Sequence, residues 1–198
     1  MPRNTLLSLL TSDHPQTYSQ PVSHFGKPRS LPGTSIWEIQ ARIGQSSPEI
    51  HSFFPRHLPL RRVVESAWAD TPISAPDRAA LERNKHKVDR LFTYFGEDLL
   101  PHNTSTTTFG EVTMAEQRLL LFMRAVVKNP DLVILDEAFS GMAEDMRRRC
   151  LAWLETPEGL TEQQALVVVS HVEEEVPRGV TSWVRLAGGG RPAEFGVV

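Results

Sequence analysis

The sequence has only one cysteine, Cys150, among its 198 residues. A single thiol excludes an intrachain disulfide, which fits a reducing intracellular compartment. The longest apolar runs, LLLFM and ALVVV, are far shorter than the roughly 20 residues that cross a bilayer, so we expect no direct membrane insertion. The first residues lack the apolar core of a secretory signal. We therefore expect an intracellular protein, cytoplasmic or mitochondrial.

An excess of charge of one sign is also missing. The chain carries 21 lysines and arginines against 24 aspartates and glutamates, a net charge of -3. This balance argues against a protein that binds nucleic acid through bulk charge, so we expect no nucleic-acid partner. The short basic stretches at 83–90 and 147–149 are typical of solvated helix faces. The hydrophobic fraction of 40% is sufficient for the packed core of one ordinary domain.

The second half of the chain alternates between strand and helix patterns. DLVILDE (131–137) and QALVVVSH (164–171) are continuous apolar runs, as expected of strands buried on both faces of a parallel sheet. The stretch 146–157 between them is helical, and TSWVRLAGGG (181–190) predicts a last strand followed by a glycine turn. The alternation predicts an α/β fold with a parallel sheet and crossover helices.

The first half has mostly helical and loop-like patterns. We expect a helix over the first ten residues, an amphipathic helix over 75–96 and another from about Thr113 to Lys128. The stretch 46–71 is rich in proline and serine and predicts loops with short elements. The tract PHNTSTTTFGE (101–111) predicts a flexible polar connection.

Three polar residues follow the two apolar strands. Asp136 and Glu137 end the first strand, and His171 ends the second. Ligands of open α/β sheets bind beyond the carboxyl ends of the strands, so these side chains are expected to share one edge. An aspartate there can bind Mg²⁺, a glutamate can orient an attacking water, and a histidine can contact a transferring phosphoryl group. The set indicates nucleotide hydrolysis, although strand-end carboxylates also occur simply for solubility.

The helix expected from Thr113 begins with its own signal. Thr113 and Glu116 have the spacing of a capping box, in which each side chain bonds the other's backbone N–H. This arrangement is complete as a structural feature. Helix N-termini also present free N–H groups and a positive dipole end to phosphates.

The segment TFGEVTMAEQRLLLFMRAVVKNPDLVILDEAFSGM (108–142) resembles the signature helix and Walker B strand of ATP-binding-cassette (ABC) ATPases. VTMAE stands in the place of the LSGGQ signature, and VVVSH resembles the switch-histidine strand. The upstream stretches LLSLLTSDHPQTYS and TSIWEIQARIGQSSPEIHSFFP are similar to the soluble molybdate-associated branch and its fungal two-cassette relatives.

The resemblance implies a P-loop NTPase-like parallel sheet with a helical lobe at about 48–128 and a Walker B to switch-histidine core at 129–198. It makes residues 1–198 a single partial domain that lacks the first strand and the phosphate loop. It also implies ATP and Mg²⁺ as cofactors, with Asp136 supporting the metal and with Glu137 and His171 catalytic. The residues expected to reach ATP held by a second cassette, in cis or in trans, are Val112, Thr113, Met114, Ala115 and Glu116.

The sequence departs from the family at the phosphate loop. It contains no GxxxxGK[ST] motif, the loop that cradles phosphates with backbone N–H groups and a lysine. The alignment leaves Arg3, Asn4 and Thr5 as the candidate phosphate contacts. Met114 and Ala115 replace signature glycines, which limits close backbone approach. Glu116 is expected to bring a negative charge near the phosphate.

Two functions follow from these observations. The chain is expected to bind and hydrolyse ATP as part of an ABC-type ATPase completed by a second cassette. The alternative is a truncated, non-catalytic module that docks on an intact cassette through 112–116. Without the phosphate loop, the sequence leaves open whether this chain alone is an enzyme, and whether it is a fragment of a longer protein or a degenerate paralogue.

Overall fold

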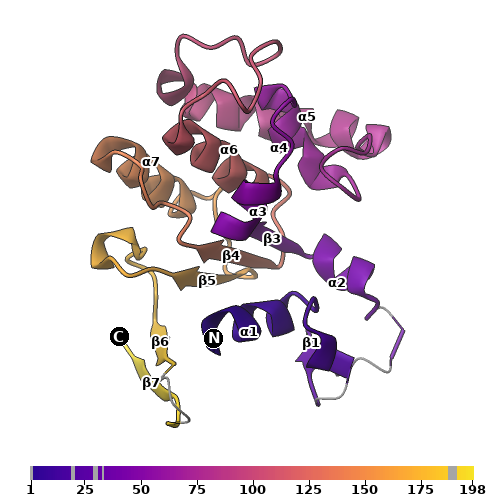
Figure 1. The fold of residues 1–198 in the computed structure, drawn as a ribbon, viewed down its shortest axis with the longest axis vertical. Helices are drawn as coiled ribbons and strands as arrows, with labels where there is room; N and C mark the ends of the chain where they lie inside the picture. The colour runs from indigo at the N-terminus through magenta and orange to yellow at the C-terminus, as the bar shows by residue number, and fades with distance from the viewer. Residues whose placement is uncertain (1, 19–20, 29–30, 33, 187–190) are drawn as a thin grey trace. The chain divides into compact units, whose positions relative to one another are not determined.

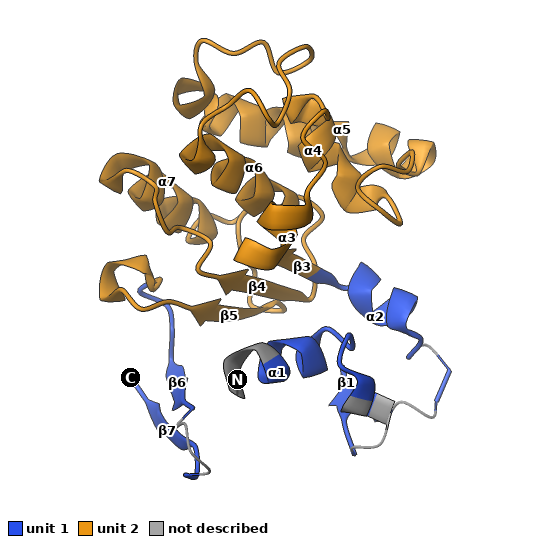
Figure 2. Cartoon of the chain, in the orientation of Figure 1, with its two compact units in different colours: residues 1–43, 178–198 blue, residues 44–177 orange. Residues whose placement is uncertain are grey.

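The computed structural model describes residues 2–18, 21–28, 31–32, 34–186 and 191–198. The chain divides into two compact units (Figure 2). One unit is formed by residues 1–43 with 178–198, and the other by residues 44–177. We call these unit 1 and unit 2. The single partial domain expected from the sequence, with its lobe and core boundaries, stays a prediction.

The elements follow one another along the chain as drawn in Figure 1. The α-helices are α1 (Pro2–Leu10), α2 (Ile36–Ala41), α3 (Pro48–Phe53), α4 (Leu60–Glu65), α5 (Arg78–Tyr94), α6 (Met114–Val126) and α7 (Glu144–Leu154). The strands are β1 (Ser23–His24), β2 (Lys27–Pro28), β3 (Ile43–Ser46), β4 (Leu132–Asp136), β5 (Ala165–Val169), β6 (Ser182–Arg185) and β7 (Glu194–Val197). Short 3₁₀ helices are η1 (Pro15–Tyr18), η2 (Ser66–Trp68), η3 (Gly96–Leu99) and η4 (Glu173–Glu175).

The central sheet has the order β3-β4-β5. β4 and β5 pair in parallel, with Leu132 opposite Ala165 and Asp136 opposite Val169. The connection between two parallel strands needs a crossover, and α7 provides it. Figure 1 shows α6 and α7 above the sheet on the same side. The predicted strand–helix–strand unit is therefore confirmed, and with it the carboxyl-end edge where the predicted catalytic residues lie.

Two strand predictions were wrong in detail. β5 is not fully buried, because it lies at an edge of the described three-stranded sheet and its residues remain partly exposed. β6 does not extend the parallel sheet. It pairs antiparallel with β7 in a separate two-stranded sheet, and all four of its residues are exposed. Antiparallel strands tolerate such exposure to water. The predicted glycine turn at 187–190 lies outside the described residues.

Helix α6 forms the centre of the core of unit 2. The five consecutive residues 119–123 are all buried, so the helix is covered on every side there. A helix that is apolar all round must be covered on all sides, and here α3, α4, η2 and β4 contact it. The aromatic rings of Phe95, Phe122 and Phe139 continue this core toward α5 and the end of β4.

The polar tract 101–111 is held in place rather than loosely connected. Backbone N–H groups of Leu60 and Arg61 donate to the carbonyls of Thr107 and Thr104, at 3.1 and 2.8 Å. Phe109 is fully buried, and its N–H donates to the Leu58 carbonyl at 2.8 Å. The prediction of a flexible connection was wrong, because these backbone bonds tie the tract to the first residues of α4 and to Leu58 just before them.

Unit 1 contains α1, α2, the β1–β2 hairpin and the β6–β7 pair. Phe25 and Gly26 have positive φ angles of 51° and 75°, as a tight two-residue hairpin turn requires. α2 begins with a complete capping box between Ser35 and Glu38. The helix predicted over the first ten residues is confirmed as α1.

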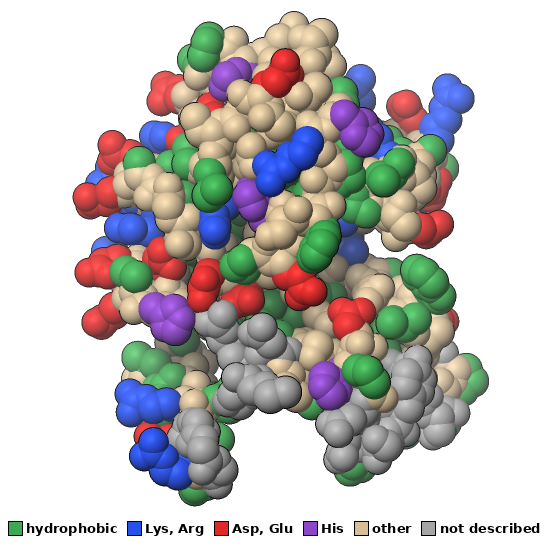
Figure 3. Space-filling view, in the orientation of Figure 1, with side chains coloured by type: hydrophobic (Ala, Val, Ile, Leu, Met, Phe, Trp, Pro, Cys, Tyr) green, Lys and Arg blue, Asp and Glu red, His purple; other side chains and the backbone are tan. Residues whose placement is uncertain are grey.

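Charged side chains of both signs are mixed on the face shown in Figure 3, including the region where α7 lies, and no extended basic area is visible there. Within the described ranges, no helix combines the length and hydropathy needed to span a bilayer.

Candidate functional site

The candidate site lies at the carboxyl end of β4. Asp136 is the last residue of the strand, and its side chain is buried. Glu137 follows in a left-handed backbone conformation, with φ of 48°. This conformation is unfavourable for a residue other than glycine, so neighbouring groups must hold it. One such group is the carbonyl of Val169 at the end of β5, which accepts the Glu137 N–H at 2.8 Å.

His171 lies in the loop that follows β5, next to Glu137. Its Nε2 is 3.4 Å from Oε1 of Glu137. The Glu137 side chain is 27% exposed and that of His171 is 77% exposed, so the pair borders open solvent. The loop after β5 is fixed by Ser170, whose hydroxyl donates to Glu175 Oε2 at 2.6 Å. The structure thus brings Glu137 and His171 together beside Asp136, while their catalytic roles stay a prediction.

Arg118, which was not predicted from the sequence, also contacts Glu137. Arg118 is the fifth residue of α6, and its Nη1 donates to the backbone carbonyl of Glu137 at 2.7 Å. Both the N–H and the carbonyl of Glu137 are therefore held, which explains how the unfavourable backbone conformation persists. No pattern in the sequence links an arginine to a carbonyl 19 positions away.

The expected capping box is present at the beginning of α6. Glu116 Oε2 accepts from both the N–H and the hydroxyl of Thr113, at 2.7 and 2.6 Å. The other oxygen, Oε1, lies 3.0 Å from Nε2 of His102. Both carboxylate oxygens of Glu116 are therefore engaged within the chain, while the expectation that it brings a negative charge near a phosphate stays a prediction.

The rest of the predicted signature segment forms an exposed rim. Thr113 is exposed, Met114 is 59% exposed and Ala115 is half-buried, whereas Val112 is buried. This rim is the N-terminus of a 13-residue helix, where backbone N–H groups lack intrahelical acceptors.

A second residue that the sequence analysis missed, Gln117, joins this rim to the core of unit 2. It is 5% exposed, and its Nε2 donates to the Val112 carbonyl at 2.9 Å. Its Oε1 lies 2.8 Å from His51 Nε2 and accepts from Arg56 Nη1 at 2.5 Å. Burial lowers the pKa of His51, and the positive charge of Arg56 contributes to the same shift. The partners lie 66 and 61 positions away, beyond the reach of sequence patterns.

The candidate phosphate contacts lie in unit 1. Arg3 and Asn4 belong to α1, and their side chains lie outside the described part of the structure. Thr5 is half-buried, and its carbonyl accepts from the Ser8 hydroxyl at 3.1 Å. The backbone here is helical, and the role of these residues as phosphate contacts stays a prediction.

The chemistry of the candidate site fits Mg²⁺ that is bound together with phosphates. In the described ranges, no group of three or more His, Cys, Asp or Glu side chains could hold a metal by itself. Mg²⁺, however, is often bound through one or two carboxylates, with phosphate oxygens and water completing the octahedron. The buried Asp136 carboxylate at the strand end matches that single-carboxylate role.

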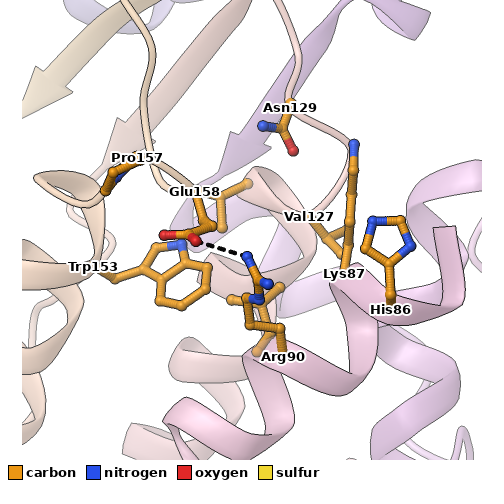
Figure 4. Close-up of a pocket in the computed structure, with 10 residues that line it drawn as sticks. His86, Lys87, Arg90, Val127, Asn129, Trp153, Pro157 and Glu158 are labelled. Atoms are coloured by element: carbon orange, nitrogen blue, oxygen red, sulfur yellow. Dashed lines mark hydrogen bonds and ion pairs between the residues drawn. The ribbon is translucent and has the colours of Figure 1, made fainter.

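Unit 2 also contains a cavity of about 190 Å³ that is separate from the candidate site (Figure 4). Lys87 and Arg90 of α5 line it, opposite Trp153 and Glu158, and Arg90 Nη1 donates to Glu158 Oε1 at 2.7 Å. Among the described residues that line this cavity, none is a predicted site residue. Asn129, which also lines it, precedes β4, so the cavity lies toward the opposite end of that strand from the predicted catalytic residues.

The comparisons with known proteins agree on one family. An uncharacterized ABC transporter ATP-binding protein of Saccharomyces cerevisiae is 34% identical over 183 residues, covering 89% of this chain and 32% of that protein. The ABC transporter ATP-binding protein ModF of Escherichia coli is 33% identical over 181 residues, covering 90% of this chain and 35% of ModF. No family profile matches the chain.

Among solved structures, a bacterial Atm1-family ABC exporter with ATP bound superimposes with a TM-score of 0.70 at 15% sequence identity. The match covers 98% of this chain and 31% of the exporter chain. The similarity confirms the predicted α/β fold class of an ABC ATPase. The chain spans about a third of the length of these relatives. It is therefore homologous to part of the ABC transporter ATP-binding proteins, and its resemblance to an ABC-type ATPase domain is confirmed.

Proposed function

We propose that this chain contributes the metal-binding and water-orienting side of an ABC-type ATP hydrolysis site and works together with a second cassette. The observation that carries the proposal is the 3.4 Å contact between His171 Nε2 and Glu137 Oε1. It lies beside the buried Asp136, at the carboxyl ends of two parallel strands. The ATP-binding names of the homologues support the same activity.

Each residue has a distinct part in the proposed reaction. Asp136 holds Mg²⁺, which when bound neutralises charge that develops on the phosphate oxygens. The Glu137 carboxylate accepts a hydrogen bond from the attacking water and orients it toward phosphorus. His171 Nε2 donates a hydrogen bond to an oxygen of the transferring phosphoryl group. The Glu137 side chain is 27% exposed, so a water can reach its carboxylate.

The exposed rim at the beginning of α6 supports the proposal of a second cassette. Thr113, Met114 and Ala115 present an exposed helix N-terminus, a natural binding place for a phosphate oxygen. Because the Glu116 carboxylate is bound to Thr113 and His102, its charge is partly compensated and repels a phosphate less than the sequence suggested. We propose that this rim contacts ATP held by the second cassette.

Titration of the purified chain with Mg-ATP by calorimetry, followed by single-turnover hydrolysis, tests the proposal. We expect saturable binding and slow hydrolysis, with hydrolysis lost in Glu137→Gln while binding is kept. Loss of one catalytic group typically costs about 10² to 10⁴ in rate. Glu144→Gln, an exposed carboxylate at the beginning of α7, is the matched control and should hydrolyse ATP like the wild type.

The alternative function is a non-catalytic module that docks on an intact cassette. The exposed apolar side chain of Met114 at the beginning of α6 favours it. If the chain gives no binding heat at millimolar Mg-ATP, alone or at concentrations where it self-associates, the hydrolytic proposal fails and the docking function takes its place.

A further inference from the structure

Two neighbouring residues of α6 hold two different functional segments. Gln117 bonds the carbonyl of Val112, at the beginning of the exposed rim, and Arg118 bonds the carbonyl of Glu137, at the end of β4. Consecutive helix residues point in directions about 100° apart, so one helical turn can hold segments on two sides. Val112 lies 5 positions before Gln117 and Glu137 lies 19 positions after Arg118, so one partner precedes α6 in the sequence and the other follows it.

The Gln117 side of this arrangement is rigid. Its amide is almost fully buried, and His51 and Arg56 fix the oxygen, so the nitrogen has one direction in which to donate. The donated bond to Val112 is buried as well. Displacement of the rim would therefore have to break buried hydrogen bonds or move the beginning of α6 with it.

The Arg118 side is simpler and more easily displaced. Its Nη1 bonds the Glu137 carbonyl at 2.7 Å, while its buried Nε has no hydrogen-bond acceptor among the residues that the structure describes. The left-handed backbone conformation of Glu137 is unfavourable without neighbours that hold it. The Arg118 bond at 2.7 Å is shorter than the other bond to the same carbonyl, which the Ser140 N–H donates at 3.3 Å. A movement of α6 would thus change the support of Glu137.

We propose that Gln117 and Arg118 form a link through which a ligand or partner bound at the exposed rim, residues 113–115, changes the backbone support of Glu137. Arg118 is the positioning residue of the link, because it acts on the Glu137 backbone and not on the reacting atoms. The link explains how contact with a second cassette at the rim reaches the water-orienting carboxylate of this chain. That last role rests on the proposed function, whereas the physical coupling between the two segments does not.

Amide hydrogen exchange measured by NMR on the whole chain tests the positioning role. We expect Arg118→Met, which keeps the length of the side chain but loses the donor, to speed exchange of the Glu137 N–H about tenfold, the size expected for loss of a hydrogen bond from a charged group. The Ile134 N–H in the middle of β4 reports global unfolding and should change little. Arg90→Met, which removes an exposed ion pair with Glu158, is the matched control and should leave both amides unchanged.

The coupling itself is tested by a double-mutant cycle. Gln117→Glu keeps an oxygen for His51 and Arg56 but removes the donor to Val112. We expect it to speed exchange of the Glu137 N–H about threefold in the wild-type background and to add nothing in Arg118→Met, because the link is already cut. An equal effect in both backgrounds, or no effect of Arg118→Met at Glu137, would overturn the proposal.

A kinetic measurement separates this inference from the proposed function. If the chain hydrolyses ATP, Arg118→Met should lower kcat and leave nucleotide affinity unchanged, since the arginine does not touch nucleotide. If the chain does not hydrolyse ATP, the proposed function fails, and the exchange measurements still decide whether the link exists.

Discussion

The buried hydrogen bonds of Gln117 give the most quantitative prediction for the fold. Gln117→Leu introduces an apolar side chain of similar size and removes three hydrogen bonds, to Val112, His51 and Arg56. The Val112 carbonyl and His51 are buried, whereas Arg56 is exposed and can bond water instead. Each buried partner left unsatisfied costs about 1–3 kcal/mol, so the free energy of unfolding should fall by roughly 2–6 kcal/mol. That is a large part of the total stability of a domain, which is typically about 5–15 kcal/mol.

Gln164 provides a matched control for this measurement. It also makes three hydrogen bonds, to the carbonyl of Pro130 and to the N–H and hydroxyl of Thr161, but it is partly exposed. Water can replace its partners, so Gln164→Leu should cost only about 1 kcal/mol. Urea unfolding followed by tryptophan fluorescence measures both variants. Equal losses of stability would refute the reasoning, because burial would then not determine the cost.

Three other predictions concern packing, pH and thiol reactivity. A Cβ at Gly44 would lie 1.8 Å from the Ala125 carbonyl oxygen, so Gly44→Ala should cost about 3 kcal/mol or more in thermal unfolding, whereas Gly96→Ala, with nothing within 4 Å, should cost little. Burial lowers the pKa of His51, so the unfolded state binds the proton first as the pH falls below about 6.5. The free energy of unfolding should therefore decrease from pH 7 to pH 5.5. In urea titrations, His51→Gln should make this decrease smaller. Burial raises the pKa of the Cys150 thiol far above its usual range, so a thiol reagent should modify it only as the chain unfolds, and rapid reaction of the native protein would contradict the structure.

The parts of the fold that the sequence predicted best depend on local patterns. The apolar run that became β4, the helical spacing of α5 and the capping box of Thr113 and Glu116 each lie within a few residues. Periodicity and capping chemistry act over that range, so they can be recognised without knowledge of the rest of the chain. The adjacency of Glu137 and His171 also followed, because parallel strands bring their carboxyl ends to one edge.

The errors arose where distant partners decide the structure. A short apolar strand such as β6 does not show which strand it will pair with, and its partner β7 was not anticipated. The tract 101–111 looks flexible in sequence because its stabilising bonds come from the first residues of α4 and from Leu58 just before them. The contact between His102 and the second oxygen of Glu116 was not anticipated, because His102 is 14 positions away in a loop.

The sequence pointed to the acidic residues and the histidine of the candidate site. It did not point to the residues that hold their backbone in place. Arg118 and Gln117 make buried or partly buried bonds to Glu137 and Val112, and neither residue type carries a local signal for such a contact. Chemistry-bearing residues at strand ends can be recognised from the residue itself. Residues that hold a backbone in place become visible only in three dimensions.

The measurement that tests the central claim most directly is paramagnetic NMR with Mn-ATP in place of Mg-ATP. We predict that Mn-ATP broadens the amide signals of Asp136, Glu137 and His171 before any others in unit 2, and that Asp136→Asn abolishes this broadening. Mn²⁺ without nucleotide serves as the control for adsorption to exposed carboxylates. Mn-ATP that broadens none of these signals, or broadens them equally in Asp136→Asn, would contradict the assignment of a nucleotide-metal site to the end of β4.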